Sequence, residues 1–250
     1  FAALRAAIVA AGHRHPFDRA VGQRAGRLVL PFLTADVIVV AQQRLAEQII
    51  DIRVVGDVGC AVVHVRHRVR GGGETSRDGL FFNPNIPTEE CFISPMKGQA
   101  EGIVYATKPL SYRGQLIEGF SIRFEGGKAV EVHAEKGEEL LKSMISMDEG
   151  AAYLGECALV PQASPIAESG LLFYNTLFDE NAACHLALGM GFPDTIEDFQ
   201  NKSLEECREL GINDSMIHED FMIGCDSMNI DAVCADGSIK AIFRKGNWAF

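Results

Sequence analysis

Five residues of types that bind metal ions stand at the borders of apolar segments in this sequence. His218 and Asp220 are two residues apart in a strand-like run, so both side chains leave the same face. His185 lies in an alanine-rich stretch, while Glu90 and Glu156 each introduce an apolar segment. Carboxylates and imidazoles without a nearby pair of thiolates suit two divalent ions better than one structural zinc ion. These residues therefore form a candidate site for divalent metal ions.

Each of these residues also has an ordinary structural explanation. A single buried histidine is more often a hydrogen-bonded core residue than a ligand, and a His-x-Asp pair also arises by chance in solvated strands. Glu156 could be a solvated loop carboxylate, and Glu89–Glu90, which follows Pro87, could lie in a surface turn. The spacing alone leaves both explanations open.

The alanine-rich stretch around His185 predicts a short helix that begins at the N-cap Asp179 and ends at Gly189. Glu180, Asn181 and His185 would then be buried among small side chains, which is costly unless they find polar partners. Asn181 and His185 are four residues apart and would share one helix face. The stretch therefore predicts that other segments supply polar partners for His185.

From Phe81 onward, strand-like and helix-like segments alternate along the chain. Glycine-containing turns at Glu125–Gly127 and Asp236–Gly237 predict two hairpins. Helices are predicted at Glu138–Met147 and Leu204–Leu210, and strands at Gly102–Leu110, Gln115–Phe124, Lys128–Glu135, Cys157–Val160, Met216–Ile223, Ile230–Cys234 and Ile239–Phe243. We therefore expect an α+β fold with a mixed, largely antiparallel sheet and packed helices.

The charge distribution separates the first 80 residues from the rest of the chain. Residues 1–80 hold 11 arginines, no lysine and 7 acidic residues, which gives +4. Residues 81–250 hold 12 basic and 27 acidic residues, which gives −15. We expect residues 1–80 to be a poorly defined N-terminal remnant and residues 81–250 to form the main folded domain.

Composition excludes several classes of partner. The net charge of −11 argues against a nucleic-acid partner. Seven cysteines without a CxxC pair favour reduced thiols in a cytoplasmic protein over a disulfide framework. The apolar run Leu28–Ala41 contains Pro31 and Asp36 and is too short to cross a bilayer, so no membrane partner is expected.

Four ordered segments resemble the successive motifs of the M29 family of metallo-aminopeptidases, of the aminopeptidase T and aminopeptidase S type. They are Asn85–Glu90, Leu154–Pro161, Leu172–His185 and Ile217–Gly224. The similarity runs from about Phe82 to the closing Gly246–Phe250. It implies that residues 81–250 are a catalytic domain that removes N-terminal amino acids from peptides through water activated by two metal ions.

The resemblance also implies a role for particular residues. It places the metal ligands at Glu90, Glu156, His185, His218 and Asp220. Many family members have a tyrosine at the metal centre where this chain has Phe192, and Tyr174 is the candidate substitute for its hydroxyl. Glu89 is the candidate shuttle for a proton to the leaving amine. The implied ions are zinc or cobalt, with magnesium or manganese as alternatives. The implied partners are peptides with a free N-terminus and a second copy of the chain in a homodimer.

Two other functions stay open on the sequence. Family chains carry a large N-terminal α/β domain that helps to form the cleft, and residues 1–80 are too short to be all of it. A truncated, catalytically silent metal-binding domain is therefore one alternative. A di-metal amidase that acts on small molecules is the other.

Overall fold

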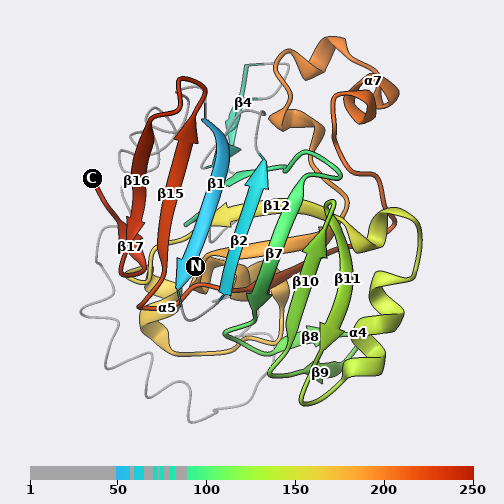
Figure 1. Cartoon of the computed structure of the whole chain (residues 1–250), viewed down its shortest axis with the longest axis vertical. Coiled ribbons are helices and arrows are strands. Elements are labelled where there is room, and N and C mark those ends of the chain that lie inside the picture. Colours follow the sequence, from blue (N-terminus) through green and yellow to red (C-terminus); the bar gives the residue numbers. More distant parts are fainter. Residues whose placement is uncertain (1–48, 57–58, 65–69, 72–73, 76–78, 83–88) are drawn as a thin grey trace.

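A computed structural model describes residues 49–56, 59–64, 70–71, 74–75, 79–82 and 89–250. Its largest element is an eight-stranded sheet with the order β11-β10-β7-β2-β1-β15-β16-β17 (Figure 1). The strands are β1 (Ile49–Gly56), β2 (Gly59–His64), β7 (Ala100–Tyr105), β10 (Ser121–Glu125), β11 (Lys128–His133), β15 (Asn229–Cys234), β16 (Ile239–Arg244) and β17 (Asn247–Trp248). The two predicted hairpins are confirmed as the pairs β10–β11 and β15–β16.

Strands β1 and β2 lie in the middle of this sheet, although they precede Phe81, where we expected the main domain to begin. β1 pairs with β15 along Ile49–Val55, and β2 pairs with β7 along Gly59–Val63. The sheet therefore crosses the expected boundary. Residues 1–48, 57–58, 65–69, 72–73 and 76–78 of the expected N-terminal remnant lie outside the described residues.

A second, five-stranded sheet has the order β14-β13-β12-β6-β3. Its strands are β3 (Arg70–Gly71), β6 (Cys91–Ile93), β12 (Leu154–Leu159), β13 (His185–Gly189) and β14 (His218–Met222). Two short hairpin-like pairs complete the strands: β4 (Glu74–Thr75) with β5 (Phe81–Phe82), and β8 (Leu110–Tyr112) with β9 (Gln115–Ile117). Every pairing among the described strands is antiparallel, which agrees with a largely antiparallel sheet but not with a mixed one.

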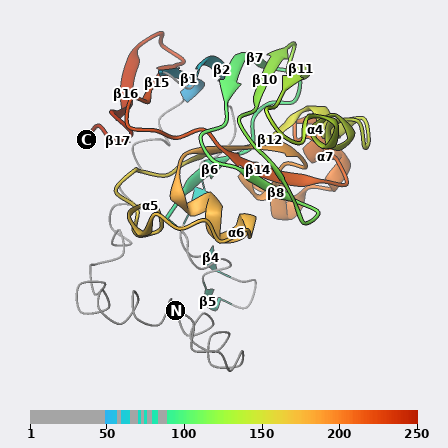
Figure 2. The same ribbon diagram turned by 90° about the horizontal axis from the view of Figure 1, so that it is seen from below.

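The two sheets form layers around one apolar core. Figure 2 shows the five-stranded sheet below the eight-stranded sheet, with α5 (Pro165–Ser169) and α6 (Thr176–Asp179) on its far side. Leu186, Leu188 and Phe221 are buried in the core that both sheets share. Phe221 packs against Phe120 with ring centroids 5.7 Å apart. Since each fully buried Leu or Phe contributes about 1.5–3 kcal/mol, this layer of side chains holds the sheets together.

The helices are short and lie outside the sheets, which is compatible with the expected α+β class. The predicted helices are confirmed as α4 (Glu138–Ile145) and α7 (Leu204–Glu209). α4 buries Leu141 and Met144, and Ser203 begins α7 with a reciprocal capping box to Glu206. The remaining turns are the 3-10 helices η1 (Gly150–Ala152), η2 (Glu180–Ala182), η3 (Pro193–Thr195) and η4 (Phe199–Asn201). In the described part of the chain, no helix has the length and apolar character needed to cross a membrane.

The helix predicted from Asp179 to Gly189 is wrong. Asp179 ends α6, the 3-10 turn η2 follows, and His185 already begins β13. β13 lies between β12 and β14, so both of its edges pair with strands that are distant in sequence. These pairings override the helix propensity of the alanines. Asn181 and His185 therefore do not share a helix face.

Candidate metal centre

One face of the five-stranded sheet carries four of the five predicted ligands, because side chains alternate between faces along each strand. Across three neighbouring strands, Glu156 lies opposite Ala187, and Ala187 lies opposite Asp220. His185 is two residues before Ala187 and His218 is two residues before Asp220, so both imidazoles are on this face. Because the side chain of Ala187 is only a methyl group, the carboxylates on either side can converge above it.

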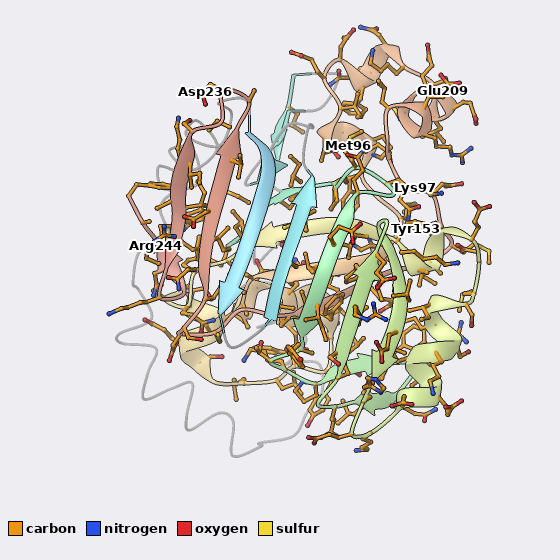
Figure 3. The ribbon with its side chains drawn as sticks, viewed as in Figure 1. Met96, Lys97, Tyr153, Glu209, Asp236 and Arg244 are labelled. Atoms are coloured by element: carbon orange, nitrogen blue, oxygen red, sulfur yellow. The ribbon has the colours of Figure 1, made fainter. Side chains whose placement is uncertain are left out.

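Close contacts fix the start of β12, the strand that carries Glu156. A Cβ atom on Gly155 would lie 2.1 Å from the carbonyl oxygen of Met190, so this position requires glycine. Next to it, the Nζ of Lys97 lies 5.2 Å from the ring centroid of Tyr153, and Figure 3 shows this pair. Lys97 follows β6 and Tyr153 precedes β12, so the contact joins the two segments that carry Glu90 and Glu156.

The five predicted residues come together in space. Nε2 of His185 lies 3.1 Å from Oε2 of Glu90 and 3.4 Å from Oε1 of Glu156. Nε2 of His218 lies 3.3 Å from Oε2 of Glu156 and 3.4 Å from Oδ1 of Asp220. Glu156 thus contacts both imidazoles and stands at the centre of the cluster.

Backbone carbonyls orient both imidazoles. Nδ1 of His185 lies 3.1 Å from the carbonyl oxygen of Ala183, and Nδ1 of His218 lies 2.7 Å from that of Met190. A carbonyl can only accept, so each Nδ1 carries the hydrogen and donates it. Each Nε2 therefore points into the cluster, which is the arrangement that a second-shell acceptor gives to a metal-binding histidine.

Burial and mutual proximity shift the titration of the cluster strongly. Although burial acts to raise it, the neighbouring imidazoles lower the pKa of Glu156 to about 2. Burial opposes protonation of His218, but Asp220 and Glu156 raise its pKa to about 11. Burial raises the pKa of Glu90. The cluster therefore stabilises positive charge at its centre.

The donor atoms fit a bound divalent cation. Oε2 of Glu90, Nε2 of His185 and Oδ1 of Asp220 are buried without a well-directed hydrogen bond. An unsatisfied buried polar group costs about 1–3 kcal/mol, and a cation bound by all three atoms would offset that cost. Carboxylate oxygens with imidazole nitrogens suit zinc and other divalent ions. The residues present therefore could hold a divalent ion, and the predicted ligand set stays a prediction.

Glu180 is a further member of the cluster that the predicted ligand set did not include. Its carboxylate, His185 and Asp220 can offer ligand atoms that lie within 4.8 Å of one another. Burial first, and then the charges of Glu90 and Asp220, raise its pKa to about 9. The sequence signal was present, because Glu180 was expected to be buried among alanines. Its approach to the cluster depends on η2, which the expected helix replaced.

An aromatic pair borders the cluster beside His218. The ring centroid of Phe192 lies 4.7 Å from that of the His218 imidazole, and Phe92 packs edge-on against Phe192 at 5.5 Å. The Phe192 amide donates to Oγ of Ser94 at 2.7 Å, which fixes the backbone next to the ring. At the position where the resemblance leads us to expect a tyrosine, the chain thus supplies apolar packing and no hydroxyl.

The two residues predicted to be catalytic lie in different surroundings. Glu89 is buried beside Glu90, and its Oε2 forms no hydrogen bond. Tyr174 is 63% exposed and has a positive φ of 57° in the loop before α6. No hydrogen bond among the described residues joins Tyr174 to the cluster, so its catalytic role stays a prediction.

Comparisons with known proteins find similarity to a family of metalloproteases. The family model for the thermophilic metalloproteases M29 matches residues 49–248. Aminopeptidase 2 of Geobacillus stearothermophilus is 54% identical over 187 residues, which cover 75% of this chain and 45% of that protein. Aminopeptidase T of Thermus aquaticus is 49% identical over 182 residues, which cover 73% and 44%. This chain thus spans about half the length of the curated relatives it matches.

Two solved structures are similar to this chain, one in sequence and fold and the other in fold alone. Wild-type AmpT from Thermus thermophilus superimposes with a TM-score of 0.78 at 40% identity, covering 86% of this chain and 53% of that chain. A 2,5-dihydroxypyridine dioxygenase from Pseudomonas putida KT2440 has a TM-score of 0.58 at 15% identity, covering 88% and 60%. At that low identity, the second similarity concerns the fold alone.

Proposed function

The chain belongs to the M29 family of metalloproteases, and from that premise we propose that it is a metal-dependent aminopeptidase that removes N-terminal amino acids from peptides. The observation that carries the proposal is the convergence of buried carboxylates and imidazoles on one sheet face. The names of the relatives, all of them aminopeptidases, support the substrate class.

Two divalent ions, zinc or cobalt with magnesium or manganese as alternatives, would be held by the six residues of the cluster. These residues are Glu90, Glu156, His185, His218, Asp220 and Glu180. Such ions, when bound, polarise a carbonyl group and lower the pKa of water. Since Glu156 contacts both imidazoles, it is the residue best placed to serve both ions.

Other residues of this chain would position the substrate and move the proton. Glu89 directly precedes Glu90 and is buried with an unpaired Oε2, so we propose that its carboxylate carries the proton to the leaving amine. The excess of carboxylates around the cluster offers an acidic wall for the free amino group of the peptide. The half-buried rings of Phe92 and Phe192 close the site beside His218.

Hydrolysis of aminoacyl-anilides tests the proposal. We expect cleavage of the free-amino substrate with added Zn²⁺ or Co²⁺, loss of cleavage in EDTA, and little cleavage of the N-acetylated substrate. The Glu156→Gln variant is the matched control, because it keeps the size of the side chain and removes the charge that faces both imidazoles. Equal cleavage of free and acetylated substrates would instead indicate a di-metal amidase.

A silent metal-binding domain is the second candidate. It is favoured by one observation, which is that Phe192 places a ring without a hydroxyl beside His218, where the family resemblance leads us to expect a tyrosine. Metal binding without hydrolysis of any free-amino substrate would support this candidate over the aminopeptidase.

A further inference from the structure

The short segment that brings Glu90 into the metal centre leads directly into strand β6. Glu89 and Glu90 are buried but lie outside any strand, and β6 begins one residue later at Cys91. Among the described residues, ladder hydrogen bonds fix the C-terminal side of Glu90 through β6. Its carboxylate nonetheless lies 3.1 Å from His185. A tertiary contact at Glu89 would help to hold the carboxylate at that place.

Asn181 supplies an attachment on the other side. Its side chain is fully buried, and its Oδ1 accepts a hydrogen bond from the Glu89 amide at 2.7 Å. Its Nδ2 donates to the carbonyl oxygen of Leu177 at 3.3 Å, which sets the orientation of the amide group. The bond to Glu89 connects residues 92 positions apart, so it fixes tertiary structure rather than a local turn.

The backbone of Asn181 is itself held firmly. Its carbonyl oxygen accepts a hydrogen bond from the Ser164 hydroxyl at 2.8 Å. Ser164 is fully buried and also caps α5 by accepting from the Ala167 amide at 3.0 Å. Asn181 directly follows Glu180 in η2. One turn thus presents the Glu180 carboxylate and, through Asn181, fixes the segment of Glu90.

We propose that Asn181 is a positioning residue of the metal centre, which holds the Glu89 amide so that the Glu90 carboxylate faces His185 before any metal binds. The proposal rests on the metal-binding function proposed above. The amide side chain suits this place because it donates and accepts without charge. An alanine would leave the buried Glu89 amide without its acceptor.

Substitution of Asn181 tests the proposal through metal affinity rather than turnover. In Asn181→Ala we expect the affinity for Zn²⁺, measured by competition with a chelator, to fall about 10- to 100-fold, as for other second-shell partners. Asn181→Asp retains the acceptor oxygen and, when protonated, the donor, so we expect it to restore most of the affinity. Wild-type affinity in folded Asn181→Ala would overturn the proposal, as would an equal loss in Asn181→Asp.

Asn229 offers a matched control for a general loss of stability. Its Oδ1 accepts from the Lys245 amide at 3.3 Å and its Nδ2 donates to the Ser227 carbonyl at 3.1 Å, which repeats the bonding of Asn181 away from the cluster. We expect Asn229→Ala to lower the melting temperature and to leave Zn²⁺ affinity unchanged. An affinity loss as large as that of Asn181→Ala would show that any loosening of the fold weakens the site.

Hydrogen exchange tests the proposal on the wild-type chain, so the result does not depend on whether a variant folds. In the metal-free wild-type chain, we expect the Glu89 amide to exchange slowly, because Asn181 already holds it. Exchange at the rate of an open loop would overturn the proposal. These results are independent of the proposed activity, since a chain that binds Zn²⁺ normally but hydrolyses nothing would refute the aminopeptidase and leave the role of Asn181 intact.

Discussion

Leu186 and Leu188 on one face of β13 are buried among apolar neighbours, whereas His185, on the opposite face of the same strand, is buried among carboxylates. β14 repeats the difference, with Phe221 on the apolar face and Asp220 on the polar face. The same backbone ladder thus presents two chemistries that alternate residue by residue. The apolar face gains stability directly from burial.

The buried charges of the polar face are stable only when a partner of opposite charge compensates them. Buried charges that lack compensation destabilise a fold, and several donor and acceptor atoms here form no hydrogen bond. Asp148, outside the cluster, shows the alternative. Its oxygens accept from the Ser215 hydroxyl at 2.9 Å and from the Met216 amide at 2.7 Å. A carboxylate whose partners are protein donors serves structure, and one without them is available to a cation.

Removing the carboxylate of Glu156 should abolish metal binding on the polar face and leave the packing of the apolar face unchanged. We expect Glu156→Gln to lower metal affinity by more than the about 100-fold loss typical of a second-shell change, because it contacts both imidazoles. The metal-free variant should melt below the wild-type temperature, because ionised Glu156 compensates both imidazoles when no metal is bound. Chelator competition and melting in EDTA measure the two effects. Retained affinity would show that Glu156 is not a ligand.

Substitutions of the adjacent carboxylates Glu89 and Glu90 test which of the two is a metal ligand and which carries the proton. Glu90→Gln should lower the number of bound metal ions, because its carboxylate faces His185. Glu89→Gln should keep the metal and slow turnover by roughly 10²–10⁴-fold. Metal counts on the two purified variants decide the roles. A full complement in Glu90→Gln, or a lost ion in Glu89→Gln, would reverse the assignment.

A substitution on the apolar face of β13 should lower stability and leave metal binding unchanged. Leu186 is almost fully buried, so we expect Leu186→Ala to lower the free energy of unfolding by about 2–5 kcal/mol. The folded variant should bind as many metal ions as the wild-type chain. Urea unfolding in EDTA, together with metal analysis, measures both quantities. A lost ion in the folded variant would mean that the two faces are not independent.

Asp148 should give the smallest effect and a distinct dependence on pH. Burial acts to raise its pKa, but hydrogen bonds from Met216, Ser215 and Ala151 lower the pKa below its ordinary 3.8. Ionised Asp148 thus stabilises the fold above the pKa of the unfolded chain, and this contribution is lost as pH falls through the lower folded pKa. Asp148→Asn should therefore melt below wild type near neutral pH, and the gap should close in acid. A gap that stays constant would contradict the assigned hydrogen bonds.

Local sequence patterns predicted much of this molecule, and contacts distant in sequence account for what they missed. The spacing of His218 and Asp220 predicted a shared strand face, and β14 has it. The alanines around His185 favoured a helix, but pairing with β12 and β14 makes a strand. No local signal specifies that β1 pairs with β15, which lies some 180 residues away. The Asn181–Glu89 bond was likewise not foreseen, because it depends on η2.

Metal analysis of the dialysed chain tests the central claim most directly, together with melting curves with and without EDTA. We predict that the wild-type chain retains divalent metal and that EDTA lowers its melting temperature. Free metal at 100 times Kd should add about 2.7 kcal/mol to the free energy of unfolding. Glu156→Gln should show neither the retained metal nor the shift. A wild-type chain that holds no metal and melts at the same temperature in EDTA and in Zn²⁺ would contradict the claim that this cluster is a metal centre.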